Sequence, residues 1–235
     1  MWTIGEIKAR GKEAFKANYW KCVLASFLLG ILTGGTTAAT RNSNNANADD
    51  ISSSFANLSS GEQLTVAGIV LGVFSVAFII ALLIRIFVKN PLEVGCYRFF
   101  KENVENPGVG LGAIKEGFSD YGHTFITLLL RDIFLVLWTC LFIIPGAIKS
   151  YSYRMVPYII KDNPELSATE TITKSREMMN GHKWRAFLLD LSFLGWILLG
   201  IVTIGIAFLL WTGPYMDSTD AALYLELKNQ NNNNN

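Results

Sequence analysis

Charge is scarce in this chain of 235 residues. Charged residues make up 17% of it, whereas about a quarter of an ordinary soluble domain is charged. The net charge of +1 offers no electrostatic footprint for nucleic acid, so we expect no nucleic-acid partner. Hydrophobic residues reach 51% and gather in long runs, which predicts a core that is built largely in lipid.

Signatures of common active sites are missing as well. The sequence has no His-Glu-x-x-His, no Gly-x-Ser-x-Gly and no Gly-Lys-Ser or Gly-Lys-Thr, which argues against a zinc protease, a serine hydrolase and a phosphate loop. The three cysteines, Cys22, Cys96 and Cys140, are odd in number and never form Cys-x-x-Cys. We expect them to be small buried hydrophobes, and we expect no enzymatic activity, no cofactor and no metal.

Five apolar stretches are candidates for membrane spans, because about twenty apolar residues cross a hydrocarbon core of roughly 30 Å. They cover residues 19–39, 64–84, 125–148, 147–160 and 187–212. The fourth stretch is also consistent with the return limb of a re-entrant hairpin, and the last with a bent hairpin. The sequence therefore predicts an all-α polytopic membrane helical bundle that forms one domain over residues 1–228.

Four segments outside these stretches differ in composition. Residues 3–17 place apolar side chains on one helical face, which predicts an amphipathic helix on the membrane surface. Residues 41–61 are rich in asparagine and serine and predict a mobile extramembrane loop, while the asparagine tail 229–235 is predicted to be disordered. The run 90–95 contains both proline and glycine and predicts a break in the helix.

Signals for helix ends gather in the second half of the chain. Pro145 and Gly146 predict an end or a kink in the third apolar stretch. The serine and glutamate at the two ends of 167–170 have the spacing of a capping box. This spacing predicts a helix over residues 167–180, which Gly181 would end.

Three ionisable residues lie within apolar stretches, where a charge is costly and is a functional hypothesis by default. They are Arg131, Asp132 and Asp190. Neighbouring residues on a helix point about 100° apart, which disfavours a pair between Arg131 and Asp132. We therefore expect Arg85 to pair with Asp132 and Asp190 to pair with Arg131; the alternative is that Arg131 extends to the lipid headgroups.

His182 follows a predicted helix end, where a cation is favourable. A metal or proton site that also uses His123, Asp120 or Asp132 is the alternative. The candidate functional or structural residues are Arg131, Asp132, Pro145, Gly146, Tyr153, Ser175, Gly181, His182, Lys183 and Asp190.

Lysine and arginine are unevenly distributed. Fifteen of the twenty fall within residues 8–21, 85–115 and 161–185. The positive-inside rule puts these groups in the cytoplasm and the loop 41–61 outside. The predicted location is thus the cell membrane, multi-pass, with a cytoplasmic N-terminus. Five crossings leave the C-terminus outside, whereas a hairpin at 187–212 returns it inside.

Several short motifs, taken together, are similar to a known family. They are Met1-Trp2, Asn18-Tyr19-Trp20, Asn90-Pro91, Val94-Gly95, Pro145-Gly146, Tyr151-Ser152-Tyr153, Asp162-Asn163-Pro164, Ser175 with Met178-Met179, Gly181-His182-Lys183, Ser192-Phe193, Gly195-Trp196 and Pro214-Tyr215. As a set they resemble a bacterial family of multi-pass membrane proteins of unknown function, the DUF975 type. Residues 145–181 are also similar to the membrane domain that some glycerophosphodiester phosphodiesterases carry beside their catalytic barrel. These resemblances imply a membrane fold and transfer no active-site residue.

The function expected from these observations is that of a non-catalytic membrane module. It would contact the lipid bilayer and bind a partner protein or lipid through the helix at 167–180. The alternative is a small transporter or export factor, in which Arg131, Asp132 and Asp190 bind an ion or substrate near the break at Pro145.

Overall fold

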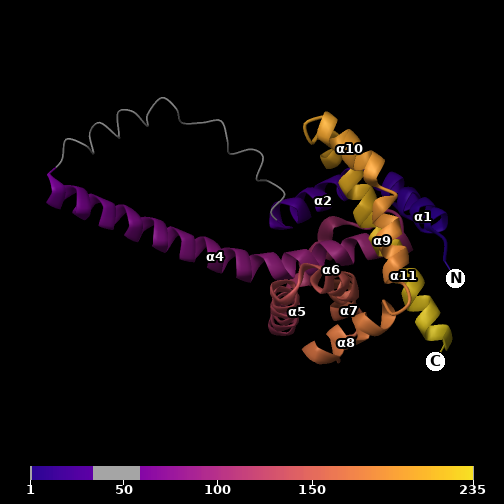
Figure 1. Ribbon diagram of the computed structural model, residues 1–235. Helices are drawn as coiled ribbons and strands as arrows, with labels where there is room; N and C mark the ends of the chain where they lie inside the picture. The colour runs from indigo at the N-terminus through magenta and orange to yellow at the C-terminus, as the bar shows by residue number, and fades with distance from the viewer. Residues whose placement is uncertain (1, 34–58, 235) are drawn as a thin grey trace. The chain divides into compact units, whose positions relative to one another are not determined.

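The computed structural model describes residues 2–33 and 59–234, which form helices, turns and irregular connections without a strand among them (Figure 1). The all-α prediction is confirmed for this part of the chain. The chain divides into two compact units, one comprising Met1–Gly30 and Asn90–Asn235, the other Ile31–Lys89. The ten candidate residues named above all lie in the first unit.

The unit Ile31–Lys89 contains the first part of α4 (Ser60–Glu105). Ser59 and Glu62 cap this helix, since the backbone N–H of each donates to a side-chain oxygen of the other, at 3.0 and 3.5 Å. The apolar stretch Leu64–Ala77, within the predicted span 64–84, is exposed almost throughout. Residues 41–58 of the predicted loop lie outside the described residues, as do residues 34–39 of the first predicted span.

The helix α4 continues through Pro91, so the break predicted at 90–95 is wrong. Instead of ending the helix, the glycine that follows the proline makes room for η1 (Leu111–Phe118), a 3₁₀ helix. A Cβ added to Gly95 would collide with the carbonyl oxygen of Ile114, and one added to Gly117 would collide with that of Pro91. This close approach of two backbones stabilises the helix where proline removes one hydrogen bond.

Helices from the two ends of the sequence pack together. The helix α1 (Ile4–Ala17) begins at a capping box formed by Thr3 and Glu6. Its predicted position is confirmed, but its apolar face is buried against α11 (Gly213–Asn234) rather than lying on lipid. A Cβ on Gly11 would lie 2.6 Å from the Cα of Thr219, which shows how closely the two helices approach.

The long helix α11 contradicts the prediction of a disordered tail, since residues 229–234 continue it. Its middle section supplies some of the most buried side chains in the unit. They include Ala221, Ala222, Leu223 and Tyr224, each at most 1% exposed. Packing of this section extends the helix into a sequence that has little tendency of its own to be ordered. The helix α2 (Tyr19–Thr33) packs its buried residues into the same core cluster.

The third apolar stretch is a helical hairpin rather than one span. The helices α5 (Tyr121–Leu141) and α6 (Ile143–Ser152) are separated by Phe142, which has an extended backbone. Pro145 therefore lies in the first turn of α6, where its missing N–H costs nothing, and the predicted break at Pro145-Gly146 is displaced to Phe142. Gly146 lets the two helices approach, because a Cβ there would lie 2.6 Å from Thr139 Oγ1.

The predicted span 147–160 is divided between the end of α6 and the short buried helix α7 (Val156–Asp162). The next helix, α8 (Ala168–Met178), has the predicted capping box of Ser167 and Glu170. Gly181, with a φ of +77°, lies just beyond its end, in the left-handed conformation that glycine tolerates best.

The last apolar stretch also reverses direction. It forms α9 (Lys183–Leu191), α10 (Leu194–Val202) and η2 (Phe208–Thr212), a short π-helix. The chain turns at Ile204 and Gly205, with φ of +54° and +85°. After the turn Thr212 Oγ1 donates to the carbonyl oxygen of Trp196 at 3.3 Å, so α10 and η2 run side by side. The hairpin, not a single span over 187–212, is the observed structure.

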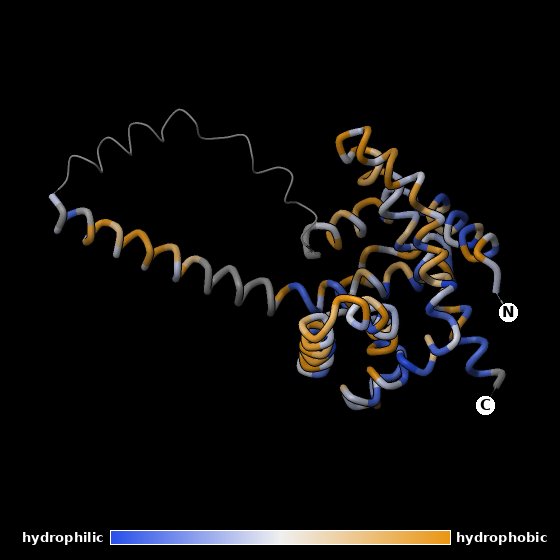
Figure 2. The backbone as a smooth tube through the Cα atoms, viewed as in Figure 1, coloured by the Kyte–Doolittle hydropathy of each residue, from blue (hydrophilic) through white to orange (hydrophobic). Residues whose placement is uncertain are grey.

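Two helical segments among the described residues are long and apolar enough to cross a membrane, Tyr121–Leu141 and Lys183–Val202. The predicted bundle of five spans is not confirmed. Figure 2 shows the α10 hairpin as hydrophobic along most of its length. Of the cysteines, Cys22 and Cys96 are buried as predicted, whereas Cys140 near the end of α5 is exposed.

Candidate functional site

A cluster of charged side chains, which we call the Arg154 cluster, joins three parts of the fold. Arg154 follows α6 and lies between Asp190 of α9 and Asp220 of α11. Its Nη1 and Nη2 donate to the two carboxylate oxygens of Asp190, each at 2.8 Å. Its Nη2 and Nε donate to those of Asp220 at 2.6 and 3.2 Å. One guanidinium thus binds two carboxylates in a bidentate manner.

Tyr151 completes the Arg154 cluster, since its hydroxyl donates to Asp190 Oδ2 at 2.9 Å. The side chains of Arg154, Asp190 and Asp220 are 18%, 31% and 21% exposed. Burial raises the pKa of Asp220, and Arg154 opposes this shift. Burial also lowers the pKa of Arg154, but the two carboxylates outweigh it and raise the pKa above its ordinary value. The cluster therefore pairs one cation with two acidic side chains.

One turn before Asp220, a second carboxyl group of α11 faces α2. Asp217 accepts a hydrogen bond from Ser26 Oγ. Burial raises the pKa of Asp217 from 3.8 to about 7, while the hydrogen bond from Ser26 lowers it. The sequence analysis missed both Asp217 and Asp220. Their only sequence signal is the spacing of three, which puts them near one face of a helix.

Arg131 and Asp132 do not have the predicted partners. Arg131 Nε donates to its neighbour Asp132 at 2.9 Å, and Arg131 Nη1 donates to Glu93 of α4 at 3.0 Å. Although neighbouring residues on a helix point about 100° apart, the long and flexible arginine side chain reaches the carboxylate of the next residue. The expected pair of Arg131 with Asp190 is wrong, because Asp190 binds Arg154. The side chain of Arg85 lies outside the described residues.

The start of the chain packs against the α8–α9 junction. Trp2 Nε1 donates to His182 Nδ1 at 3.3 Å, and the two rings stack with centroids 6.2 Å apart. Arg185 Nη1 donates to the carbonyl oxygen of Trp2 at 2.8 Å. Burial and the nearby Arg185 lower the pKa of His182. His182 thus joins the N-terminus to α9, and no group of three metal-ligating side chains occurs among the described residues.

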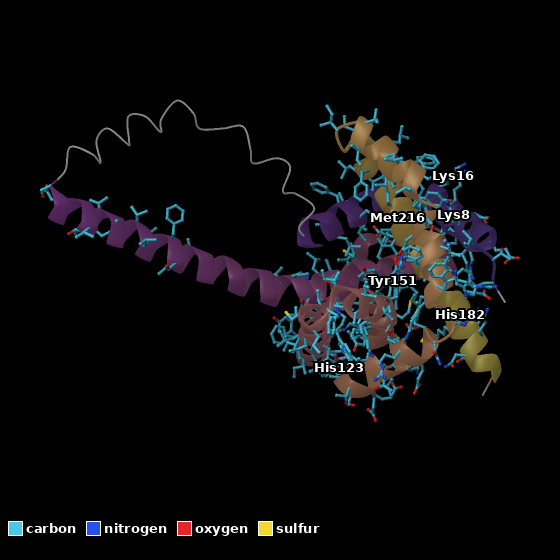
Figure 3. All side chains as sticks on the ribbon, in the orientation of Figure 1. Lys8, Lys16, His123, Tyr151, His182 and Met216 are labelled. Atoms are coloured by element: carbon cyan, nitrogen blue, oxygen red, sulfur yellow. The ribbon has the colours of Figure 1, made fainter. Side chains whose placement is uncertain are left out.

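Further along α1, Lys8 contacts the junction of α9 and α10. Its Nζ donates to the carbonyl oxygen and to Oγ of Ser192, both at 3.1 Å, and lies 4.2 Å from the ring centroid of Phe193. The labelled side chains of Lys8 and His182 belong to this region, where α1 lies beside α9 (Figure 3). Lys8 thus connects α1 to the Ser192-Phe193 motif, 184 residues later in the sequence.

Comparison with known families gives a match to the region that contains the Arg154 cluster. Residues 133–231 match the model of a family described as Protein of unknown function (DUF975). We call residues 133–231 the DUF975 region, after the family whose model they match. No curated protein matches the chain, and no solved structure matches it. The likeness to glycerophosphodiester phosphodiesterases has no support from these comparisons and stays a prediction.

The DUF975 region also holds the remaining candidates, and two of them are packing residues. Tyr153 is 5% exposed and belongs to a small apolar cluster with Leu128 and Ile172. Ser175 is fully buried, and its Oγ donates to the carbonyl oxygen of Ser152 at 2.8 Å. This bond ties α8 to the end of α6, so both residues hold the elements on which the charged groups lie.

A surface pocket of the DUF975 region is bordered by α6, α8 and α9. It has a volume of about 280 Å³ and is lined by Lys149, Thr173, Arg176, Glu177, Asn180 and Lys183. Lys183 is the only one of these that the sequence analysis selected. Lys149 and Arg176 were missed, because only the fold brings three cations from three helices together.

Proposed function

We propose that the protein is a non-catalytic integral membrane module whose α8 surface binds a lipid or a partner protein at the cytoplasmic side. The observation that carries this proposal is the exposed apolar tip of the α5–α6 hairpin. Leu141, Phe142, Ile143 and Ile144 are 62%, 69%, 81% and 75% exposed. A contiguous apolar surface of this kind is stabilised by lipid and not by water.

The exposed apolar surface extends along α5. Ile126, Ile133 and Val136 lie on one face of this helix, and all three are exposed. The opposite face contains the buried Thr124 and Leu128. A helix of 21 residues is about 32 Å long, which is comparable to the thickness of the hydrocarbon core. We infer that α5 lies at the edge of the protein with one face toward lipid.

The α10 hairpin is a re-entrant element in this proposal. Its first limb has 9 residues and is about 14 Å long, roughly half of the hydrocarbon thickness. The turn exposes Val202 and Ile204, which are 79% and 93% exposed. Because the chain then returns as η2 and α11, the hairpin enters the bilayer without leaving on the far side. The backbone of the turn would lie within the membrane, where neighbouring protein groups must satisfy it.

Contacts between distant segments support a common side for both termini and α8. Trp2 is bonded to His182 and Arg185, so the N-terminus and the α8–α9 junction lie together. The helix α11 packs on α1 through Gly11 and Thr219. The clusters of lysine and arginine favour the cytoplasm as this side. We infer that the N-terminus, α8 and the C-terminal helix all face the cytoplasm.

The geometry favours this module over a transporter that uses Arg131, Asp132 and Asp190. Each of these side chains is engaged in an ion pair, with Glu93 and Arg154 as further partners. An ion or substrate would have to displace hydrogen-bonded partners that are at most 3.0 Å away. The charges are better explained as links between helices, which is the commoner role of a satisfied pair inside a membrane protein.

Cysteine accessibility in intact cells tests the proposed arrangement. Single cysteines would replace Lys12, Glu177 or Asn229, which are all exposed, in a chain that lacks the three native cysteines. We expect an impermeant maleimide to label none of them until the membrane is permeabilised. Labelling of Glu177→Cys from outside would refute the cytoplasmic surface, and labelling of Asn229→Cys alone would refute the re-entrant hairpin.

Purification in a mild detergent tests the binding part of the proposal. We expect a lipid or a protein to co-purify reproducibly with the wild type and to be lost when the exposed face of α8 is changed. A chain that retains no lipid and no protein under the same conditions would contradict a binding module.

A further inference from the structure

The surface pocket between α6, α8 and α9 has an unusual charge. Three of its six lining residues are cations, namely Lys149, Arg176 and Lys183, and one is an acid, Glu177. Each cation comes from a different helix, so the grouping depends on the fold and not on one basic segment. The pocket carries a formal charge of about +2, since three positive charges face one negative charge.

These cations lack an anionic partner among the described residues. No ion pair or hydrogen bond joins the side chain of Arg176 or of Lys183 to another described residue, whereas Arg98, Arg131 and Arg154 form ion pairs. The Lys149 amino group lies 4.6 Å from the centroid of the Trp138 ring, a cation–π contact that holds it in place.

We propose that this pocket binds a phosphate group, carried either by an anionic lipid or by a free phosphate anion. An arginine fork and two lysine ammonium groups are the side chains that proteins use most for phosphate. Thr173 and Asn180 add a hydroxyl and an amide that can donate to further oxygens. The volume of about 280 Å³ suits a headgroup or a small anion rather than a larger ligand.

This inference deepens the proposed function, since it names the ligand class of the α8 surface and rests on that surface lying at the membrane. Trp138 and the exposed apolar tip at residues 141–144 lie on the same hairpin as Lys149. Tryptophan is enriched where headgroups meet acyl chains. A lipid whose phosphate lies in the pocket would therefore have apolar protein surface beside its chains.

Direct binding to the purified full chain in neutral detergent micelles tests the proposal. The probes are dihexanoyl phosphatidic acid, dihexanoyl phosphatidylcholine and inorganic phosphate, each titrated and followed by calorimetry. We expect saturable binding of phosphatidic acid that is stronger than that of phosphatidylcholine. If inorganic phosphate binds as well and competes, the free anion is a ligand; if it does not, the lipid headgroup is the ligand. Absence of saturable binding for both anions would overturn the proposal.

Matched variants assign the binding to the pocket. We expect the triple variant Lys149→Gln, Arg176→Gln, Lys183→Gln to weaken binding about tenfold or more, since charge-assisted hydrogen bonds are lost. The variant Lys12→Gln, Lys16→Gln, Lys115→Gln removes the same charge from exposed positions elsewhere and should bind as the wild type does. Equal affinity of the triple pocket variant and the wild type would refute the assignment.

A variant that should strengthen binding shows whether a loss of binding in the triple variant could come from misfolding. Glu177 is exposed on α8, and Glu177→Gln removes the negative charge of the pocket without burying anything new. We expect this change to tighten binding about two- to threefold, because one repulsion is removed. Weaker binding would contradict the proposal. Accessibility of cysteines in cells should be the same in the pocket variants and in the wild type, so failure of the pocket is distinguishable from failure of the membrane arrangement.

Discussion

The variant Arg154→Met should destabilise the protein strongly. Arg154 makes four hydrogen bonds of 2.6 to 3.2 Å to Asp190 and Asp220. Without it, two carboxylates from α9 and α11 face each other with no cation between them. Removing one partner from a buried ion pair costs about 3 to 5 kcal/mol.

The exposed fractions of the Arg154 cluster decide the magnitude. Side chains that are 18% to 31% exposed are partly screened, so the expected loss is about 3 kcal/mol, at the lower end of that range. For a chain of 235 residues this corresponds to a fall in Tm of roughly 6 to 12 °C. The Tm is measured by heating the fluorescently tagged chain in detergent and determining by size-exclusion chromatography how much folded protein remains.

The control is Arg176→Met, the same substitution at an exposed arginine that has no ion pair among the described residues. We expect it to change the free energy of unfolding by about 0.5 kcal/mol or less. A further variant, Arg154→Met with Asp190→Asn and Asp220→Asn, should recover a large part of the loss, since no unpaired charge remains. Equal Tm values for Arg154→Met and Arg176→Met would refute the role given to the cluster.

Two further predictions concern α11 and its neighbours. Because burial raises the pKa of Asp217 from 3.8 to about 7, the folded state binds this proton more tightly than the unfolded state, so stability falls as the pH rises between these values. Asp217→Asn should remove this dependence on pH and should be more stable than the wild type at pH 8, by at most about 4 kcal/mol. Tm values of both chains at pH 4.5 and pH 8 test this prediction. The same change of Tm with pH in the two chains would contradict it. Gly11→Ala should lower the free energy of unfolding by about 1 to 3 kcal/mol, because the added Cβ would lie 2.6 Å from Thr219 Cα. Gly5→Ala has open space around it and should be neutral or stabilising. Melting curves of the two variants that coincide would contradict this account of the packing.

Local signals in the sequence were sufficient for some elements. The capping box at Ser167 and the glycine at 181 locate α8 within a few residues, because both act through bonds within one or two turns. The same holds for α1, whose apolar face is readable from its period. What this face contacts is a tertiary matter, and α11 rather than lipid covers it.

Elements that depend on distant contacts could not be predicted. Pro91 would end an isolated helix, but η1 packs on α4 at that point and the helix continues. In the sequence alone, the charged residues of α11 look like those of an exposed tail. In the fold, Asp220 binds Arg154, which lies 66 residues earlier. The partner of Arg131 could not be predicted from its direction on the helix, because Glu93, 38 residues earlier, is within reach of its side chain. Only the fold determines such partners.

The depth of Cys140 in a bilayer tests the membrane placement most directly. This cysteine is exposed beside the apolar tip of the α5–α6 hairpin, while Cys22 and Cys96 are buried, so a fluorophore is directed to Cys140. A fluorophore on Cys140 should be quenched by a nitroxide on a lipid acyl chain and protected from aqueous iodide, whereas the same fluorophore on Glu177→Cys should behave in the opposite way. Quenching of both positions by iodide to the same extent would contradict a hairpin that is embedded in lipid.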